Sequence, residues 1–365
     1  MTHQGRKSTC VVYQNIILSQ RCSMVLVIVN KIYLVITIFV IALLFLNFYG
    51  LFDKTTEDSN PQLIPRTTFV VNEYGSLYDY DRQSPIIFIG GAPQSGMTLM
   101  RAMLDAHPEL RCAEENRAVP GILEMLAKIM KSKNETMRLE EAGITGQILE
   151  SAMSSFVLEI IAKHGGPAPR LCNKDPLTLK YGTHLQRLFP NGKFLFMVRD
   201  GRAVVHSMIS RNETIPGFDL TSYRKSLTMW NTVMKRMNSQ CAQLGPEHCL
   251  VVTYEQLVMH TRESMEKVLA FFELPWTEDV LHHETQIYKL DEKTFSTFVG
   301  SSGQVANAVN TESLSKWVGH IPEGVVAEMD EIAPMLKTMG YDPNKNPAYY
   351  EDIGNEIFYE INAIE

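Results

Sequence analysis

The stretch IIFIGGAPQSGMTLMRAMLDAHPELRCAEENR, residues 86–117, decides the fold of this chain. It opens with an apolar run at 86–89, which indicates a buried strand, and continues through a turn rich in glycine, proline and serine at 90–96. Residues 98–106 then have a helix-compatible sequence. A loop between a strand and a helix binds anions, because unpaired backbone N–H groups and the helix dipole face the ligand. We therefore expect a phosphate-binding loop here.

The spacing of the glycines within this loop limits the kinds of ligand that it can bind. Gly91 and Gly96 enclose four residues, as in the P-loop of nucleotide-binding proteins, but Met97 stands where a triphosphatase carries lysine. The loop therefore favours nucleotide phosphates without the usual machinery of phosphoryl transfer. An ordinary turn of an α/β domain is the alternative that these residues leave open.

Further strands and helices are predicted downstream. Apolar runs at 193–198 and 250–253 indicate two more strands, each followed by a helix, at 202–211 and 262–274. Residues 118–165 have apolar side chains at helical spacing and predict two helices. Strands separated by helices imply a mostly parallel sheet flanked by helices, whose ligands bind at the carboxyl ends of the strands.

A second phosphate-binding set follows the strand at 193–198. Arg199 ends that strand, and Ser207 and Arg211 share one face of the predicted helix because they are four residues apart. Two guanidinium groups and a hydroxyl suit a phosphate. Surface ion pairs among Arg199, Asp200 and Arg202 are the alternative. Tyr254 also follows a predicted strand, so we expect these residues to meet the loop at 90–96.

Charge is distributed unevenly along the 365 residues, which suffice for one large α/β domain or two small ones. The net charge is −7, and residues 1–31 contain four lysines and arginines and no acid, so the remainder carries −7 − 4 = −11. A strongly acidic domain argues against nucleic acid as a partner. An acidic substrate would instead be drawn by a local basic pocket.

Residues 32–52 are uncharged and long enough to cross a bilayer as one helix. Basic residues precede them and acids follow, so the positive-inside rule places residues 1–31 in the cytosol and the remainder in the secretory lumen. A cleaved signal peptide is the alternative, but it usually has a shorter apolar core and a small-residue cleavage site. We expect residues 53–84 to form a luminal stem.

Cysteine usage fits a luminal domain. Four cysteines follow the predicted membrane span, namely Cys112, Cys172, Cys241 and Cys249. An oxidising compartment would pair such an even set as disulfides. Cys241 and Cys249 are close enough to close a short loop, which leaves Cys112 for Cys172. Metal binding is the alternative, but no CxxC motif or histidine pair accompanies these cysteines. Glycosylation sequons, which matter only in the lumen, occur at Asn134 and Asn212.

Longer motifs carry a resemblance to a known family. They are PxSGxTLMRAMLDAHPELRCxEExR within residues 93–117, LCNKDPLTLK at 171–180, KFLFMVRDGRAVVHSMISR at 193–211, YEQLV at 254–258 and LSKWVGHIP at 314–322. Together they resemble the tyrosylprotein sulfotransferases, Golgi enzymes that sulfate tyrosine in secretory proteins. The resemblance implies a P-loop-like sulfotransferase fold with a catalytic domain at 85–345, followed by an acidic C-terminal tail at 346–365. It also implies a homodimer and the same two disulfides.

The resemblance implies the reaction and its catalytic residues. The donor is 3′-phosphoadenosine 5′-phosphosulfate (PAPS), the product is adenosine 3′,5′-bisphosphate (PAP), and no metal is required. Transfer to a phenol needs a base for its proton and cations for the growing charge. Glu115 matches the base, Lys174 and Ser301 match residues that stabilise the transition state, and Arg117 matches a substrate-side arginine. From the residues alone, Glu114 and Glu115 cannot be told apart.

The resemblance also implies the donor contacts. Arg199, Ser207 and Arg211 match the site of the 3′-phosphate, which distinguishes this donor from ATP. The remaining implied contacts are Gln94, Ser95, Gly96, Met97, Thr98, Tyr254, Ser301, Ser302, Gly303, Gln304, Val305, Ala306, Asn307, Ala308, Val309, Asn310 and Lys316.

The sequence departs from the family pattern at four positions. The family usually has arginine in place of Gln94, threonine in place of Met97, arginine in place of Gly121 and lysine in place of Asn307. Glutamine supplies no positive charge, and loss of one preorganised charge-stabilising donor typically costs about 10²–10³ in rate. Arg101, one helical turn further along, is a second possible source of that charge.

We therefore expect a type II Golgi membrane protein that sulfates tyrosine in acidic segments of secretory and membrane proteins. A non-catalytic homologue that binds nucleotide or peptide is the alternative, which Gln94 favours. A carbohydrate sulfotransferase would share the donor site but fits the CxEExR and CNKDP motifs poorly. In the acidic tail, Tyr350 precedes Glu351 and Asp352, and Tyr359 precedes Glu360, so self-sulfation of these tyrosines is a further hypothesis beside an ordinary exposed tail.

Overall fold

The computed structural model describes residues 34–41, 67–72, 74–212, 215–287, 311–346 and 350–351. It divides the chain into two compact units, residues 1–62 and 63–365. In the first unit, residues 34–41 form a helix with exposed apolar side chains. The rest of the predicted span at 32–52 lies outside the described residues. Among the residues described, no single helix is long and apolar enough to span a membrane.

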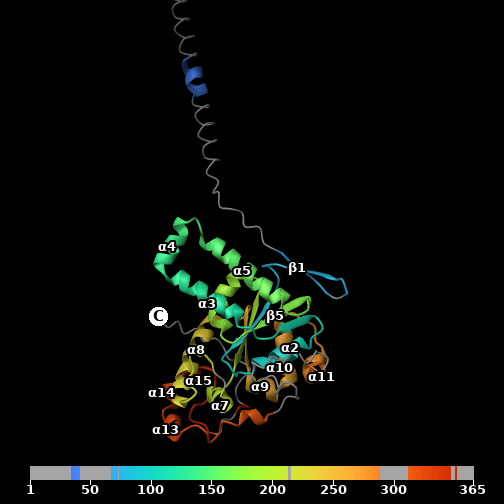
Figure 1. The fold of residues 1–365 in the computed structure, drawn as a ribbon, viewed down its shortest axis with the longest axis vertical. Helices are drawn as coiled ribbons and strands as arrows, with labels where there is room; N and C mark the ends of the chain where they lie inside the picture. Colours follow the sequence, from blue (N-terminus) through green and yellow to red (C-terminus); the bar gives the residue numbers. More distant parts are fainter. Residues whose placement is uncertain are drawn as a thin grey trace, which may run out of the picture. The chain divides into compact units, whose positions relative to one another are not determined.

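A five-stranded parallel sheet forms the centre of the second unit (Figure 1). Its order is β4 (Leu110–Ala113), β5 (Arg170–Lys174), β3 (Ile87–Gly91), β6 (Lys193–Val198) and β7 (Cys249–Thr253). All neighbouring strands are parallel. The strands predicted from the three apolar runs are confirmed, and so is the α/β class, whereas β4 and β5 were not predicted.

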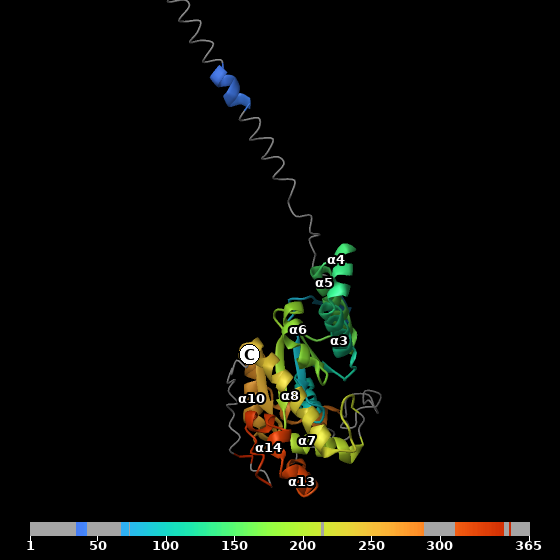
Figure 2. The same cartoon turned by 90° about the vertical axis from the view of Figure 1, so that its left-hand side faces the viewer.

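Helices cover both faces of this sheet, because each buried strand alternates its side chains between two cores. Ile87 and Ile89 face α2 (Met97–Asp105) and α10 (Thr261–Phe271). Phe88 faces the opposite core, which includes α6 (Gly182–Leu188), α7 (Gly201–Arg211) and α8 (Tyr223–Leu244). Figures 1 and 2 show α8 and α10 in these positions.

The region between β4 and β5 contains three helices, not the two predicted. They are α3 (Ala118–Lys131), α4 (Lys133–Glu141) and α5 (Gly146–Lys163). Ser132 separates the first two, and its hydroxyl accepts a hydrogen bond from the N–H of Glu135, which starts α4 as an N-cap. Among the described residues, α4 and α5 are the one pair of helices that is together long and apolar enough to span a membrane, and they are bent by 98° at their break.

Part of the predicted stem belongs to the folded domain. Strands β1 (Thr68–Val71) and β2 (Leu77–Tyr80) pair as an antiparallel hairpin. The buried Tyr80 hydroxyl donates to the carbonyl of Ala168 at 2.7 Å and accepts from its N–H at 3.0 Å. The hydroxyl of Thr68 donates to Glu159 Oε1 at 2.9 Å. The prediction of a linker up to residue 84 is therefore wrong for residues 68–80.

The remaining helical elements of the second unit are short. They are η2 (Thr178–Tyr181), α9 (Tyr254–Met259), η3 (Glu278–Leu281), α11 (His283–Ile287), η5 (Glu312–Leu314), α13 (Glu323–Val326), α14 (Met329–Ile332) and α15 (Met335–Thr338). Trp317, Tyr341 and Tyr350 join the same core as α8. The expectation of an exposed tail from residue 346 is wrong at Tyr350, whose burial also argues against its self-sulfation.

Two disulfides are present among the residues that the structure describes. Cys112–Cys172 joins β4 and β5 at directly paired positions, and Cys241–Cys249 joins the end of α8 to the start of β7. Their sequence separations are 60 and 8 residues. In the chain-entropy model, the longer closed loop restricts the unfolded state more strongly.

Removing the two disulfides separately should therefore destabilise the protein unequally. The double substitution of Cys112 and Cys172 by serine should lower the free energy of unfolding by about 4 kcal/mol, against about 2 kcal/mol for the same change at Cys241 and Cys249. Urea unfolding of the two variants and the unmodified protein measures this. Equal losses would contradict the loop-length argument.

Candidate active site

The carboxyl ends of four strands meet at a cavity of about 630 Å³. The strands β3, β6 and β7 contribute the loop at 92–96, Arg199 and Tyr254, and β5 contributes Lys174. The expectation that these segments converge is confirmed by their shared cavity. The predicted site residues that line it are Gln94, Gly96, Met97, Thr98, Glu115, Arg117, Lys174, Arg199, Ser207, Arg211, Tyr254 and Lys316.

The loop at 92–96 is shaped by close packing against Tyr254. Gly96 has φ 94°, and a Cβ there would lie 2.3 Å from Cδ2 of the tyrosine ring. Only glycine fits this position. The α2 helix begins at the next residue, so its first backbone N–H groups are free of intrahelical partners. Ser95 lies beneath the loop, fully buried, and its hydroxyl has no partner among the described residues.

Arg199 is held against this loop from several sides. One terminal nitrogen donates to the carbonyl of Gln94 at 2.9 Å, and the other donates to the carbonyl of Ser313 at 3.0 Å. The guanidinium carbon lies 4.3 Å from the centre of the Tyr254 ring. Its buried Nε has no acceptor in the described part of the chain. Ser207 donates from its hydroxyl to Gln94 Oε1 at 3.2 Å, so the loop and α7 meet through Gln94.

Glu115 and Lys174 form a buried ion pair in the same cavity. Lys174 Nζ lies 2.9 Å from Glu115 Oε2, and the two side chains are only 1% and 7% exposed. Arg117 Nε donates to the other carboxylate oxygen at 2.9 Å. Burial alone would raise the pKa of Glu115, but Lys174 and then Arg117 outweigh it and lower that pKa below its ordinary value. Glu115 is therefore an ionised carboxylate at neutral pH.

The structure shows which of the two adjacent acids lines the cavity, a question that the sequence alone left open. It is Glu115 and not Glu114. Glu114 Oε1 lies 2.7 Å from a terminal nitrogen of Arg101. The buried Arg101 also donates to the carbonyl of Cys112 at 3.1 Å. Arg101 is thus committed to an acid outside the cavity lining. It does not replace the charge that the family has at the position of Gln94.

Asp175 is a site residue that sequence analysis missed. It is fully buried and accepts from the N–H of Arg117 at 2.8 Å and from Asn173 Nδ2 at 3.1 Å. Burial raises the pKa of Asp175 to about 6, although the two hydrogen bonds act in the opposite direction and lower it. Its bond to Arg117 supports a left-handed backbone at that residue, where φ is 57°. In the sequence, only its place next to Lys174 pointed to the site.

Several other cavity residues were not predicted. They are Pro93, Leu99, Pro120, Gly121, Glu124, Pro176, Leu177, Lys180, Tyr181, Ala203, His206, Ser210, Ile215, Pro216, Ser313 and Trp317. His206 and Ser210 are four residues apart on α7, as Ser207 and Arg211 are, so helical spacing was an available signal. The cavity residues on α3 and η2 showed no such pattern.

Other residues predicted from the sequence lie away from this cavity or outside the described residues. The loop from Ser301 to Asn310 lies outside the described residues. The sequon residues Asn134 and Asn212 are exposed, on α4 and at the C-cap of α7. Within the described ranges, no three His, Cys, Asp or Glu residues are grouped to hold a metal ion.

Fold and site together define a sulfotransferase, and the Sulfotransferase family model matches residues 85–278. The chain is 56% identical over 273 residues to Protein-tyrosine sulfotransferase 2 of Gallus gallus, covering 75% of this chain and 74% of that protein. It is 55% identical to Protein-tyrosine sulfotransferase 1 of Homo sapiens, with the same coverage. The Protein-tyrosine sulfotransferase of Drosophila melanogaster is 54% identical, over 79% of this chain and 58% of that protein's length. The chain belongs to the protein-tyrosine sulfotransferase family.

The fold is also similar to that of a solved structure with lower sequence identity. The Sulfotransferase Domain from the Curacin Biosynthetic Pathway has 22% sequence identity and a TM-score of 0.49, covering 70% of this chain and 98% of that domain.

Glu255 is a fully buried acid behind Arg199. Its Oε1 accepts from the N–H of Asp200 at 3.0 Å, and its Oε2 accepts from the Tyr341 hydroxyl at 2.7 Å. Burial raises the pKa of Glu255 to about 7, and the charge of Asp200 adds to this effect. The folded protein therefore holds this proton more tightly than the unfolded chain does, where the pKa is about 4.5.

This shift predicts a loss of stability as pH rises from about 4.5 to 7, with the folded state most favoured at the acidic end. A single proton contributes at most about 1.4 kcal/mol per pH unit to the free energy of unfolding. Glu255→Gln, which cannot titrate, should flatten the curve by that contribution. Urea unfolding from pH 4.5 to 8 tests this, with the exposed Glu323→Gln as the control. Parallel curves for the Glu255 variant and the unmodified protein would refute the shift.

Proposed function

We propose that this protein transfers the sulfuryl group of PAPS to the hydroxyl of tyrosine in acidic segments of secretory and membrane proteins. The observation that carries this proposal is the buried Glu115–Lys174 pair, 2.9 Å apart, in one cavity with the loop at 92–96 and Arg199. A carboxylate base and a cation thus lie beside a site suited to a nucleotide carrying two separate phosphates.

The unsatisfied polar atoms of the site fit this donor. The Ser95 hydroxyl and Arg199 Nε are buried without partners in the part of the chain that the structure describes. Buried polar groups are rarely left unpaired, so a phosphate oxygen is a fitting acceptor for both. We assign the 5′-phosphosulfate to the loop at 92–96 and α2, and the 3′-phosphate to Arg199, Ser207 and Arg211. Tyr254, Lys316 and residues 301–310 complete the proposed donor site.

Glu115 is proposed to accept the phenolic proton as the tyrosine oxygen attacks sulfur. The new bond is between that oxygen and sulfur, and the bond that breaks joins sulfur to the bridging oxygen, so PAP leaves with the electron pair. Lys174 stabilises the charge on PAP, with Ser301 near the bridging oxygen. As Lys174 turns from Glu115 to the phosphate, the carboxylate keeps Arg117 but loses one of its two cations and becomes a stronger base.

The acceptor side of the cavity is suited to acidic peptides. Arg117 and Lys180 line it with positive charge, while Glu124 adds one negative charge. Gly121, where the family usually has arginine, leaves open space within the described structure. Arg117 is 56% exposed, so it can pair with an acidic residue beside the acceptor tyrosine.

The topology proposed with this function is a Golgi type II membrane protein. Residues 1–31 would lie in the cytosol, residues 32–52 in the membrane and the sulfotransferase domain in the lumen. The two disulfides support an oxidising compartment, and exposed Asn134 and Asn212 are available for glycosylation there. We also propose a homodimer and a reaction that requires no metal.

A non-catalytic homologue remains a second candidate because of one observation. Gln94 is neutral and bonds to Ser207, and Arg101 is paired with Glu114, so neither brings positive charge to the transferred group. The donor site would be intact in both candidates.

The donor assignment predicts tight binding of PAP that depends on Arg199. Arg199→Ala should weaken it by about 1.5–3 kcal/mol, because a charge-assisted phosphate contact is lost. Titration calorimetry measures this. The control ligand is AMP, which lacks the 3′-phosphate and should bind weakly to both proteins. Equal affinity for AMP and PAP would overturn the assignment.

The charge deficit at the loop predicts that Gln94→Arg raises kcat on an acidic tyrosine peptide. A guanidinium there would stabilise the transition state more than the ground state, while the peptide KM changes little because the loop faces the donor. The measurement is sulfate transfer from labelled PAPS.

Glu115→Ala is the control for this measurement and should abolish transfer with either residue at 94, because the phenol loses its base. If Gln94→Arg binds PAP normally but neither it nor the unmodified protein transfers sulfate, the non-catalytic candidate is favoured. A decrease in kcat would contradict our account of the loop.

A further inference from the structure

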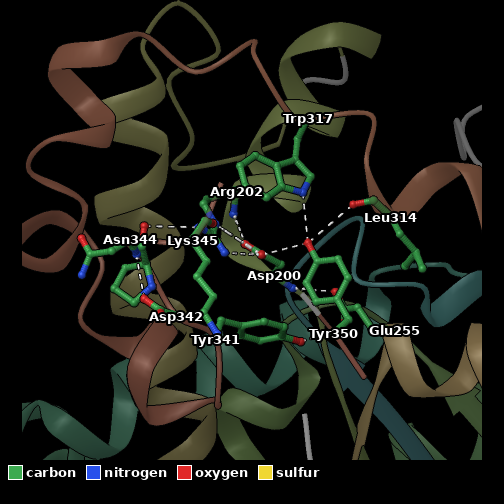
Figure 3. Close-up of polar contacts among 11 residues, drawn as sticks. Asp200, Arg202, Glu255, Leu314, Trp317, Tyr341, Asp342, Asn344, Lys345 and Tyr350 are labelled. Atoms are coloured by element: carbon green, nitrogen blue, oxygen red, sulfur yellow. Dashed lines mark hydrogen bonds and ion pairs between the residues drawn. The ribbon is translucent and has the colours of Figure 1, made fainter. Parts of the chain in front are cut away.

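The hydroxyl of Tyr350 joins two segments that are distant in sequence (Figure 3). It donates to Asp200 Oδ2 at 3.0 Å and accepts from Trp317 Nε1 at 3.0 Å. The Tyr350 carbonyl accepts from Gln256 Nε2 at 3.1 Å. The side chain is only 8% exposed, so these bonds are shielded from water.

Each partner of that hydroxyl adjoins the donor site. Asp200 follows Arg199, and its carboxylate caps α7 by accepting from the N–H of Arg202 at 2.9 Å. That helix carries Ser207. The position of Asp200 therefore determines both the position of Arg199 and the point at which α7 begins.

Trp317 ends a segment, residues 313–317, that forms another wall of the cavity. In this segment the carbonyl of Ser313 accepts from Arg199 at 3.0 Å, and its hydroxyl lies 2.7 Å from that of Tyr254. Lys316, a proposed donor contact, immediately precedes Trp317 and is 60% exposed. The indole is 1% exposed, so it anchors the segment in the core.

Arg202 reinforces this arrangement from the other side. It forms two bonds to the carboxylate of Asp200, at 3.0 and 2.8 Å, and its guanidinium lies 4.4 Å from the Trp317 ring. It also donates to the carbonyls of Pro343 and Lys345 at 3.2 and 2.9 Å. Because Arg202 pairs with Asp200, the charge of this carboxylate stays balanced even when the Tyr350 hydroxyl is removed. The hydroxyl of Tyr350 is thus a separate link, whose loss leaves Trp317 Nε1 without its acceptor.

We propose that Tyr350 is a positioning residue for the sulfate donor. By fixing residues 313–317 to Asp200, its hydroxyl sets the distance between the cavity wall that bears Lys316 and the one that bears Arg199. Tyr350 lines no part of the cavity and touches no reacting group. This inference rests on the proposed function, since it assigns the 3′-phosphate to that site.

Tyr350→Phe tests the proposal, because it removes one oxygen and keeps the ring. We expect the Kd for PAP to rise about tenfold, the equivalent of one net buried hydrogen bond. In an active enzyme the KM for PAPS should rise similarly, while kcat and the KM for the peptide stay close to those of the unmodified protein. A general loosening of the fold would change all three.

Tyr80→Phe is the matched control, because its hydroxyl is equally buried and makes two hydrogen bonds, both to Ala168. It should lower stability as Tyr350→Phe does and leave the Kd for PAP unchanged. Trp317→Phe removes the other end of the link, so the double variant of Tyr350 and Trp317 should bind PAP no more weakly than the weaker single variant.

The outcomes separate the two proposals. If the unmodified protein does not bind PAP, the proposed function fails and this inference fails with it. If it binds PAP, but Tyr350→Phe leaves Kd unchanged or the two substitutions are additive, only the positioning role is overturned. An equal loss of PAP affinity in Tyr80→Phe would likewise overturn it, because the effect would then follow from stability alone.

Discussion

The buried ion pair between Glu115 and Lys174 is the interaction on which the site depends. Removing two charges from water costs several kcal/mol each, and their attraction repays this only in good geometry. The geometry here comes from the backbone: β4 and β5 are paired, Cys112–Cys172 joins them, and Asp175 holds the turn at Arg117. Such a pair adds little net stability, so its main consequence is that the backbone fixes a carboxylate and a cation side by side in the cavity.

Glu114 and Glu115 are adjacent in sequence, but their side chains point in opposite directions because extended backbone alternates its side chains. Glu114 turns inward and neutralises Arg101 on α2, whereas Glu115 turns to the cavity. The inward pair explains why the helix that follows the phosphate loop brings no cation to it. Positive side chains reach the cavity from other elements instead, namely Lys174 on β5, Arg199 directly after β6 and Arg211 on α7. Gln94 links the loop to α7 without adding charge.

The sequence predicted those parts of the fold that have strong local patterns. β3 and β6 are continuous apolar runs and were placed to within two residues, but β4 and β5 are short and contain Arg111, Arg170 and Lys174, so no apolar pattern identified them. The hairpin at 68–80 has polar and exposed residues along both strands, and only tertiary contacts bring it into the domain. That Arg199 and Ser207 meet at one cavity was predictable from strand-end position and helical spacing. Asp175 and Tyr350 were not, because their partners lie far away in sequence.

The electrostatics of the domain are those of a local basic site in an acidic surrounding. Beyond residue 31 the chain carries −11, yet Lys180 and Arg199 both line one cavity. Charges in a cleft with low-dielectric walls focus their field outward, whereas charges spread over the surface are screened within about 8–10 Å at physiological ionic strength. An acidic peptide is therefore repelled weakly by the surface at long range and attracted strongly at the cavity mouth. The buried pairs Arg101–Glu114 and Arg202–Asp200 take no part in this attraction, since each cation already has its acid. The number of cations left uncompensated at the cavity, rather than the net charge, then determines how strongly an anionic donor and acceptor are held together.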